Sequence, residues 1–187
     1  DIRSHIQKQP SPLCIIQQTE YTPINLNNYN RGFRAILAPD LRSSHAQHKT
    51  NQLALNTIAL NRAHQEGFDD AIFTKDQQLI EGASSNIFAF DGQNLITPPL
   101  GNIVPGITRK MVIDIAKEHA IPVQISPVLI DHIDQYSEIF LSSSTKLLKP
   151  IIEIQNIFSK PSTGPIWQLI MQSYLQKTAC NILQPNF

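Results

Sequence analysis

The sequence feature that most constrains the fold is a series of four short apolar segments in the middle of the chain. The segments read DAIFT (70–74), QLIEG (78–82), NIFAF (86–90) and NLITP (94–98), and short polar turns such as KDQ and DGQ separate them. Segments of this length, bounded by Gly, Asp, Asn and Pro, are typical of β-strands, and short connections favour antiparallel neighbours. The sequence therefore predicts a β-meander.

Helices and further strands are expected around this meander. Apolar residues at helical spacing predict helices at 50–66, 106–120 and 166–183. Other short apolar runs predict strands at 13–19, 33–39, 121–128, 138–144 and 150–155. Strands thus outnumber helices, and the meander comes before a helix–strand alternation. This pattern favours an α+β fold with a barrel-like sheet over a doubly wound sheet.

The charge balance excludes some classes of partner. The 187 residues include 15 basic and 15 acidic side chains, and no five like charges follow one another. Binding to nucleic acid or to an anionic membrane surface requires a basic patch, so neither is expected. With 41% hydrophobic residues, the chain has enough apolar side chains for a core. We therefore expect a small-molecule ligand.

The two cysteines indicate a reducing compartment. Cys14 and Cys180 lie far apart and match no spacing of metal ligands, so we expect no metal site and two buried free thiols. The apolar runs are too short to cross a bilayer, and no signal segment opens the chain. The sequence thus predicts a cytoplasmic protein. Four histidines in polar stretches are expected at the surface, namely His45, His48, His64 and His119.

The start of the sequence is typical of a connector. It begins at Asp1 without Met, and its first ten residues, DIRSHIQKQP, are mostly polar. We therefore interpret residues 1–12 as an interdomain connector and residues 13–187 as one domain, and we expect a further segment ahead of Asp1.

Glu81 stands out because it follows an apolar run and precedes a turn of small residues, in IEGASSNIF (80–88). Taken alone, such a residue is typical of a solvent-exposed turn. Two other segments favour a binding site: PGITR (105–109) places a Pro–Gly turn before a helix, and FLSSST (140–145) ends a strand in four hydroxyls. Free N–H groups at a helix N-terminus attract anions, and hydroxyls donate to the same anion. The two segments together predict a phosphate site.

Lys49 completes this set, since it stands immediately before the helix predicted at 50–66. Pyridoxal phosphate needs an amine that forms a Schiff base, an acid that keeps its pyridine nitrogen protonated, and an anion site for its phosphate. The sequence offers all three in Lys49, Glu81 and the predicted phosphate site. We therefore expect pyridoxal 5'-phosphate as the cofactor.

The order and spacing of five motifs resemble those of the fold-type IV pyridoxal-phosphate enzymes. The motifs are K-T-N (49–51), E-G-A-S-S-N (81–86), T-P-P-L (97–100), P-G-I-T-R (105–109) and S-S-S-T (142–145). This family includes branched-chain and D-amino-acid aminotransferases and aminodeoxychorismate lyase. The resemblance implies that residues 13–187 form the larger, C-terminal pyridoxal-phosphate-binding domain of the D-amino-acid aminotransferase-like fold. The family's smaller N-terminal domain, of roughly a hundred residues, is largely absent from the sequence.

The resemblance implies roles for individual residues. Lys49 would carry the cofactor as a Schiff base and move the proton at the substrate Cα, and Glu81 would pair with the pyridine nitrogen. Gly106 would allow the close approach through which the N–H groups of Ile107 and Thr108 reach the phosphate. The remaining candidates are Ser143 and Ser144 on a second phosphate-binding loop, and Val104 on one face of the ring, with plain core packing as the alternative for Val104.

Two assignments have open alternatives. Arg3 and His5 resemble the Arg-x-His pair with which D-amino-acid aminotransferases hold the substrate carboxylate, and a solvated polar tail is the alternative. Arg109 is either a charge on the phosphate side or a residue on the surface of its helix, and we expect the surface.

The resemblance implies an enzyme that transfers an amino group between a small amino acid and a 2-keto acid. The first alternative is 4-amino-4-deoxychorismate lyase, which uses the same lysine and cofactor and releases pyruvate and 4-aminobenzoate from aminodeoxychorismate. The second is a catalytically impaired homologue, because the sequence lacks the small domain and its phosphate-binding arginine. A homodimer with the site near its interface is also implied.

Overall fold

The computed structural model describes residues 14–18, 20, 26–42 and 45–178. The predicted connector at 1–12, with Arg3 and His5, lies outside the described residues, as does Cys180. None of the helices in this part of the chain combines the length and the apolar character that crossing a membrane requires.

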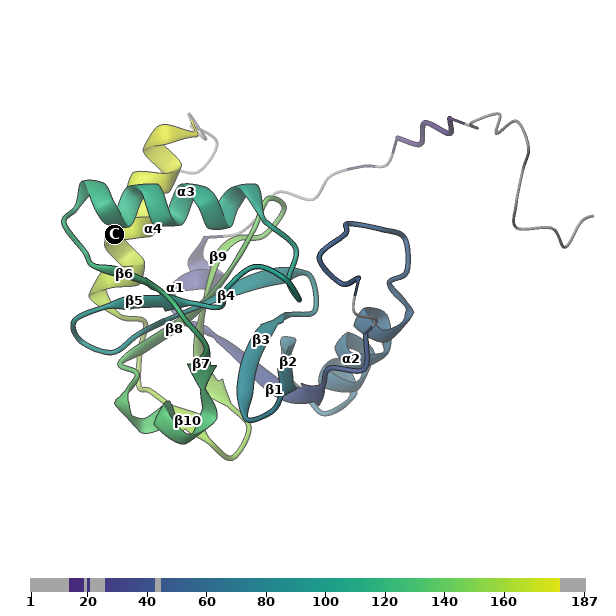
Figure 1. The fold of residues 1–187 in the computed structure, drawn as a ribbon, viewed down its shortest axis with the longest axis horizontal. Coiled ribbons are helices and arrows are strands. Elements are labelled where there is room, and N and C mark those ends of the chain that lie inside the picture. Colours follow the sequence, from purple (N-terminus) through teal and green to yellow (C-terminus); the bar gives the residue numbers. More distant parts are fainter. Residues whose placement is uncertain (1–13, 19, 21–25, 43–44, 179–187) are drawn as a thin grey trace, which may run out of the picture.

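Six strands close into a barrel (Figure 1). These strands are β1 (Phe33–Pro39), β2 (Asp70–Lys75), β3 (Gln78–Gly82), β4 (Ser85–Phe90), β8 (Glu138–Ser143) and β9 (Leu147–Ile154). Around the barrel, β4 is followed by β8, β9, β1, β2 and β3, and β3 pairs with β4 again. β1 runs parallel to its neighbours β2 and β9, whereas the other pairs are antiparallel. The expected α+β fold with a barrel-like mixed sheet is therefore confirmed.

Four short strands extend the barrel sheet. They are β5 (Leu95–Thr97), β6 (Val123–Ile125), β7 (Val128–Leu129) and β10 (Phe158–Ser159). β5 pairs with β4, β6 with β5, β7 with β3, and β10 with β9. The single strand expected at 121–128 is thus wrong, because the chain bends at 126–127 between β6 and β7. Pro127 has no N–H to donate to a strand ladder, which explains the break.

The predicted meander is present as β2, β3, β4 and β5. A two-residue turn joins β2 to β3, and both of its residues, Asp76 (φ 50°) and Gln77 (φ 59°), have positive φ. Turns of this type match the right-handed twist of an antiparallel hairpin. The meander brings Glu81 on β3 opposite Asn86 on β4.

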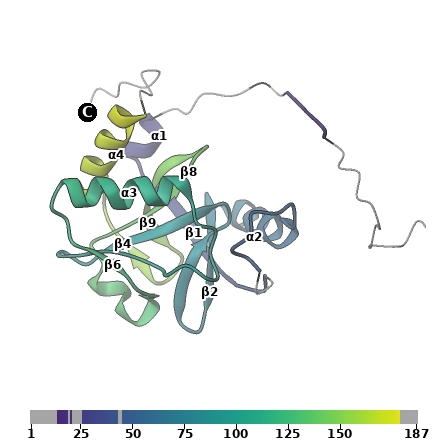
Figure 2. The same cartoon turned by 45° about the horizontal axis from the view of Figure 1, so that its top comes forward.

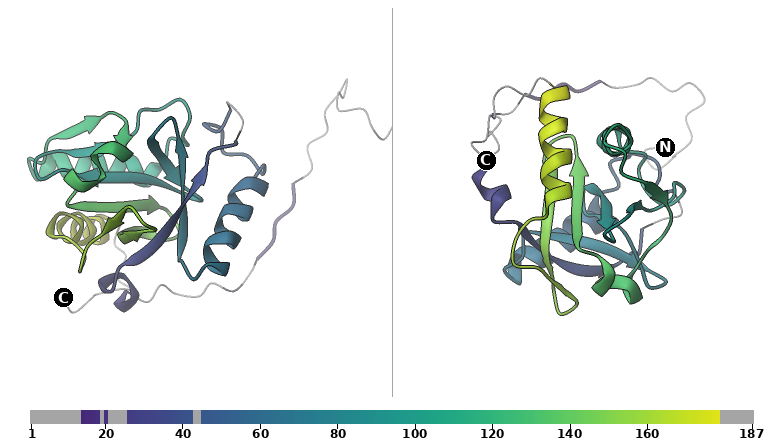
Figure 3. Two further views of the ribbon diagram at one scale, coloured as in Figure 1. Left: turned by 90° about the horizontal axis from the view of Figure 1, so that it is seen from below. Right: turned by 90° about the vertical axis from the view of Figure 1, so that its left-hand side faces the viewer.

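Helices cover two sides of the barrel. α2 (Ala54–Gln65) packs on β1 and β2, whereas α3 (Ile107–Glu118) and α4 (Pro165–Lys177) pack against each other and against β8 (Figures 1, 2 and 3). The short helix α1 (Asn27–Asn30) precedes β1, and a 3-10 helix, η1 (Ile130–Gln135), follows β7. Accordingly, the core has two parts: a large cluster that includes Trp167, Phe88 and Phe140, and a smaller one under α2 that includes Ile36 and Phe73.

Two expectations near the start of the described chain are wrong. Residues 14–18 of the strand expected at 13–19 form no strand, and Cys14 is exposed rather than buried. Ile15 and Ile16 are 78% and 91% exposed. A short apolar run becomes a strand only where a neighbouring strand can pair with it, and no strand of the described chain pairs with this segment.

Candidate functional site

Glu81 is a buried strand residue and not a solvent-exposed turn residue. It lies on β3 with 3% of its surface exposed, opposite Phe73 on β2 and Asn86 on β4. The turn of small residues predicted after it begins only beyond Gly82, between β3 and β4. The alternative of a solvated turn is therefore wrong. A buried carboxylate requires partners for both of its oxygens.

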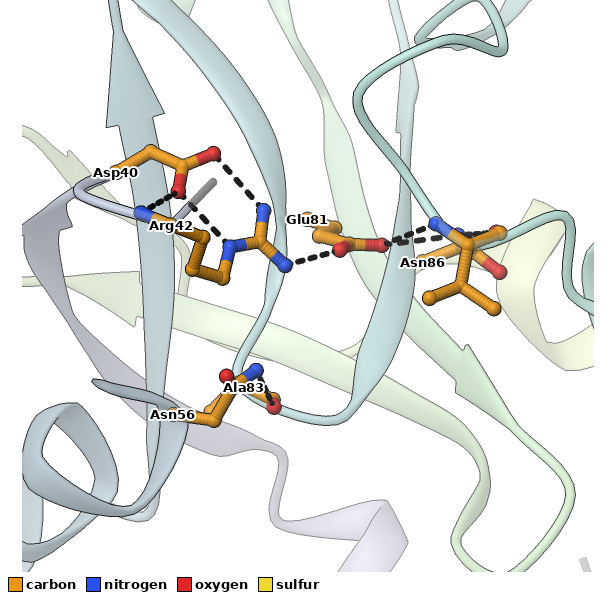
Figure 4. Close-up of polar contacts among 7 residues, drawn as sticks. Asp40, Arg42, Asn56, Glu81, Ala83 and Asn86 are labelled. Carbon is orange, nitrogen blue, oxygen red and sulfur yellow. Dashed lines mark hydrogen bonds and ion pairs between the residues drawn. The ribbon is translucent and has the colours of Figure 1, made fainter. Parts of the chain in front are cut away.

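Both oxygens of Glu81 have partners (Figure 4). Oε1 accepts a hydrogen bond from Nη1 of Arg42. Oε2 accepts from Nδ2 of Asn86 at 3.3 Å and from the backbone N–H of Val104 at 3.3 Å. These contacts join three separate segments, from the end of β1, from β4 and from the loop before α3, at one carboxylate.

Arg42 is itself clamped by Asp40. Nε and Nη2 of Arg42 donate to the two oxygens of Asp40 at 2.8 Å and 2.9 Å, a bidentate pairing that Figure 4 shows beside Glu81. The side chains of Arg42 and Asp40 are 10% and 7% exposed. Since two of its nitrogens are bound to Asp40, the guanidinium presents its remaining nitrogen to Glu81.

Burial and charge oppose each other in this cluster. Burial raises the pKa of Glu81 to about 7, although the hydrogen bond and charge of Arg42 and the N–H of Val104 lower it. Burial also acts to raise the pKa of Asp40, but the bonds and charge of Arg42 outweigh it, so that this pKa lies below its usual value. Burial acts to lower the pKa of Arg42, and the two carboxylates raise it above its usual value. Glu81 is therefore the member of the cluster that changes charge near neutral pH.

The two segments predicted to bind phosphate lie next to each other. α3 begins at Ile107 after Gly106, and no side chain caps its N-terminus. Thr108, in the first turn of α3, is 4% exposed, and its hydroxyl lies 3.4 Å from the hydroxyl of Ser144. Ser143 instead uses its hydroxyl to accept from the backbone N–H of Lys146, within its own turn. Uncapped N–H groups beside two hydroxyls form an arrangement suited to an anion.

Two buried hydroxyls near this site have no partner. Among the described residues, Oγ of Ser85 and Oγ of Ser142 are buried without a hydrogen bond. Ser142 on β8 lies opposite Asn86 on β4, and Ser85 precedes Asn86 in the chain. Buried polar groups are almost always bonded, so an unpaired hydroxyl indicates a place for a further group.

Position 106 requires glycine because the side chain of Asn86 lies close to its backbone. A Cβ built at Gly106 would lie 2.1 Å from Oδ1 of Asn86, whereas its backbone φ of −66° suits any residue. Nδ2 of the same Asn86 donates to the carbonyl of Val104 at 2.8 Å. The loop before α3 therefore packs directly on the partner of Glu81.

The structure brings some predicted residues together and leaves others apart. Glu81, Val104 and Gly106 meet around Asn86, and Thr108 and Ser144 contact each other beside the start of α3. Ile107 is 79% exposed at the start of α3. Lys49 is exposed in the segment between β1 and α2, and within the described chain no hydrogen bond or ion pair joins it to Glu81 or Thr108.

The expectation that Arg109 lies at the helix surface is wrong. Arg109 is 6% exposed, and it donates to the carbonyl of Pro98 at 2.8 Å and to Oγ1 of Thr97 at 3.3 Å. Burial lowers its pKa. The side chain therefore ties the T-P-P-L segment to the start of α3. The expected surface positions of His45, His48, His64 and His119 are confirmed.

Sequence reasoning missed three residues of the site. Asn86 ends the E-G-A-S-S-N motif but received no role, and Asp40 and Arg42 belong to no motif. One available signal was the pair of opposite charges, two residues apart, directly after an apolar strand. Such charges face the same way at a strand end and can pair.

Comparison with known proteins identifies the family of the chain. Residues 3–154 match the family described as Amino-transferase class IV. A D-alanine aminotransferase of Listeria monocytogenes is 29% identical over 188 residues, which cover 97% of this chain and 65% of that protein. The chain therefore spans just under two thirds of the length of this curated relative.

Solved structures share the fold. A Legionella pneumophila protein assigned as a 4-amino-4-deoxychorismate lyase superposes with a TM-score of 0.76 at 26% identity, over 85% of this chain and 59% of that one. The branched-chain aminotransferase of Thermoproteus uzoniensis, solved with norvaline, superposes with a TM-score of 0.72 at 29% identity, over 78% of this chain and 51% of that one. Because the family match spans more than half of its length, the chain belongs to the class IV aminotransferase family.

Proposed function

We propose that this chain carries the pyridoxal-phosphate site of an enzyme that transfers an amino group between a small amino acid and a 2-keto acid. The observation that carries the proposal is the buried Glu81 carboxylate, bonded on one oxygen to Arg42 and on the other to the loop that leads into α3. The D-alanine aminotransferases among the relatives support the reaction class.

The residues present fit the cofactor at both of its ends. A buried carboxylate with a cationic partner suits a protonated pyridine nitrogen, and the uncapped α3 N-terminus beside Thr108 and Ser144 suits a phosphate. The unpartnered hydroxyls of Ser85 and Ser142 leave donors for a further group. When bound, pyridoxal phosphate supplies a ring that accepts the electrons left behind when the substrate Cα loses its proton.

Within this proposal each side chain has a separate task. Glu81 holds a proton on the ring nitrogen, and Val104 packs on one face of the ring. The N–H groups of Ile107 and Thr108 bind the phosphate, since Gly106 leaves the start of α3 uncapped. The phosphate also accepts hydrogen bonds from the hydroxyls of Thr108, Ser143 and Ser144.

Lys49 is assigned the amine that holds the cofactor and moves the proton at the substrate Cα. Lys49 is exposed and lies in residues 45–53, a stretch without helix or strand that leads into α2. Arg3 and His5 are assigned to the substrate carboxylate, because Arg binds a carboxylate through two parallel hydrogen bonds.

Reduction with borohydride tests the proposal. The purified chain is mixed with pyridoxal phosphate and reduced, and the modified peptide is identified by mass spectrometry. We expect one cofactor attached to Lys49, and none after Lys49→Ala. Lys110→Ala serves as the control, because Lys110 is an exposed lysine paired with Asp114 on α3. Cofactor attached equally to several surface lysines would contradict the assignment.

The lyase remains the alternative function, favoured by the Legionella pneumophila structure that shares the fold. Amino transfer to a keto acid, measured beside pyruvate release from aminodeoxychorismate, separates the two reactions. If neither product forms although borohydride still attaches the cofactor specifically to Lys49, the chain is the catalytically impaired homologue.

We also propose a homodimer in the cytoplasm. Exposed apolar side chains at Leu41, Leu53, Leu100 and Ile107 support an interface on the segments that lead into α2 and α3. The exposed thiol of Cys14 is consistent with a reducing compartment. Sedimentation of the purified chain tests the dimer, and a monomer at all concentrations would contradict it.

A further inference from the structure

Arg42 is held in place from three sides. Asp40 binds its Nε and Nη2, Glu81 binds its Nη1, and the guanidinium lies 4.4 Å from the centre of the Phe73 ring. Phe73 on β2 is also the strand neighbour of Glu81. The orientation of the guanidinium is thus set by its surroundings, and it in turn orients one oxygen of Glu81.

Arg42 is also the cation that faces Glu81. Of the charged groups in the described chain that act on the Glu81 carboxylate, Arg42 favours the ionised form and Asp40 opposes it. The other neighbours are neutral: the Asn86 amide on β4 and the backbone N–H of Val104. Removal of Arg42 would therefore leave a buried carboxylate with hydrogen bonds but without a countercharge.

We propose that Arg42, anchored by Asp40, is a positioning residue that favours the ionised form of Glu81 and fixes its orientation in the cofactor site. The inference rests on the proposed function, because an ionised Glu81 is what holds a proton on the ring nitrogen. Asp40 contributes by binding Nε and Nη2 of Arg42, which prevents the guanidinium from rotating away from Glu81.

Arg34, which lies on β1, offers a matched control. Its Nε and Nη2 bind the two oxygens of Glu153 at 2.7 Å and 3.2 Å, and its guanidinium lies 4.5 Å from the centre of the Phe68 ring. Its side chain, however, is 46% exposed. Arg34 and Arg42 thus make the same kinds of contact, and only Arg42 faces the candidate site.

The test is a titration of Glu81 in the chain without cofactor. Side-chain carboxyl ¹³C signals of labelled Glu are followed against pH, and Glu81→Gln identifies the Glu81 signal. We expect Arg42→Gln to raise the Glu81 midpoint by about 1–3 pH units, because an opposite charge at this distance is removed. Arg42→Lys should return the midpoint toward that of the wild type, and Arg34→Gln should leave it unchanged. An unchanged midpoint in folded Arg42→Gln would overturn the proposal.

Loss of folding in Arg42→Gln would also be informative. If its defect is an unpaired buried charge, the variant should regain its fold as the pH falls and Glu81 takes up a proton. A variant that stays unfolded at every pH would show a structural role only and would overturn the proposal. Because no cofactor is present, the outcome is independent of the proposed function, whose failure would appear as missing reduction at Lys49.

Discussion

The backbone N–H of Val104 donates to Oε2 of Glu81 at 3.3 Å, so the loop that enters α3 is bonded to the buried carboxylate on β3. Asn86 strengthens this link, since its Nδ2 donates both to Oε2 of Glu81 and to the carbonyl of Val104. The loop that leads into the proposed phosphate end of the site is therefore hydrogen-bonded to the carboxylate at the proposed ring-nitrogen end. A change at one end of the site is therefore expected to alter the geometry of the other end.

The stability of the chain should depend on pH through Glu81. Burial raises the pKa of Glu81 to about 7 from an ordinary 4.5, so between these values the folded chain holds a proton that the unfolded chain releases. This contribution is present in full below the unfolded pKa and is lost as the pH rises through the folded pKa. The free energy of unfolding should thus fall by roughly 2 kcal/mol between about pH 5 and pH 7.

Chemical denaturation across this pH range measures the effect, with Glu81→Gln as the comparison that should flatten the slope. Asp40 does not interfere, because its pKa is lowered. Its contribution is therefore present above its ordinary pKa and is lost only at lower pH. An equal slope in wild type and Glu81→Gln would show that another group is responsible.

Gly106→Ala should destabilise the chain through Asn86. The added Cβ would lie 2.1 Å from Oδ1 of Asn86, so the amide must move and its bonds to Glu81 and Val104 weaken. We expect a loss of about 1–3 kcal/mol in the free energy of unfolding. In an Asn86→Ala background the same change should cost less, and equal costs in both backgrounds would exclude this mechanism.

Lys149 on β9 and Asp70 on β2 form a second buried ion pair. Their atoms Nζ and Oδ2 are 2.6 Å apart, and their side chains are 8% and 1% exposed. Lys149→Met leaves Asp70 as an unpaired buried charge and should cost about 3–5 kcal/mol in unfolding free energy. The exposed pair of Lys110 and Asp114 is the control, where Lys110→Met should cost less than about 0.5 kcal/mol. Similar losses at both pairs would contradict this account.

The elements of the fold were largely predictable because their signals are local. The hairpin between β2 and β3 and the apolar spacing of α2 and α3 lie within short windows of sequence, and the structure has all of them. The strand prediction for the exposed residues 14–18 was wrong because strand formation depends on a distant pairing partner, which a short window of sequence does not contain.

Site residues were predictable where they belong to a sequence motif. Residues that join the site only through contacts across the barrel were missed. Glu81 and Thr108 stand in recognisable segments. Arg42 contacts Glu81 from a separate strand end, and Arg109 is buried only because Thr97 and Pro98 accept its hydrogen bonds. Burial of a charged side chain depends on partners that are far away in sequence.

Turnover should fall in Glu81→Gln while cofactor stays bound. The amide keeps the shape of the side chain but no longer favours a protonated pyridine, so charge spreads less well into the ring. A lost charge-assisted contact is worth roughly 1.5–3 kcal/mol, or about one to two powers of ten in rate if it is expressed fully in the transition state. Single-turnover kinetics measures it, and a rate within about twofold of wild type would remove Glu81 from the mechanism.

The protonation of the ring nitrogen reports directly on its pairing with Glu81. Pyridoxal phosphate labelled with ¹⁵N in the ring is bound to the wild-type chain and to Glu81→Gln, and the ring ¹⁵N chemical shift is recorded at one pH. We expect the shift of a protonated pyridine in the wild type and that of a neutral pyridine in Glu81→Gln. The same ¹⁵N shift in both proteins, with cofactor bound to each, would contradict the pairing of Glu81 with the ring nitrogen.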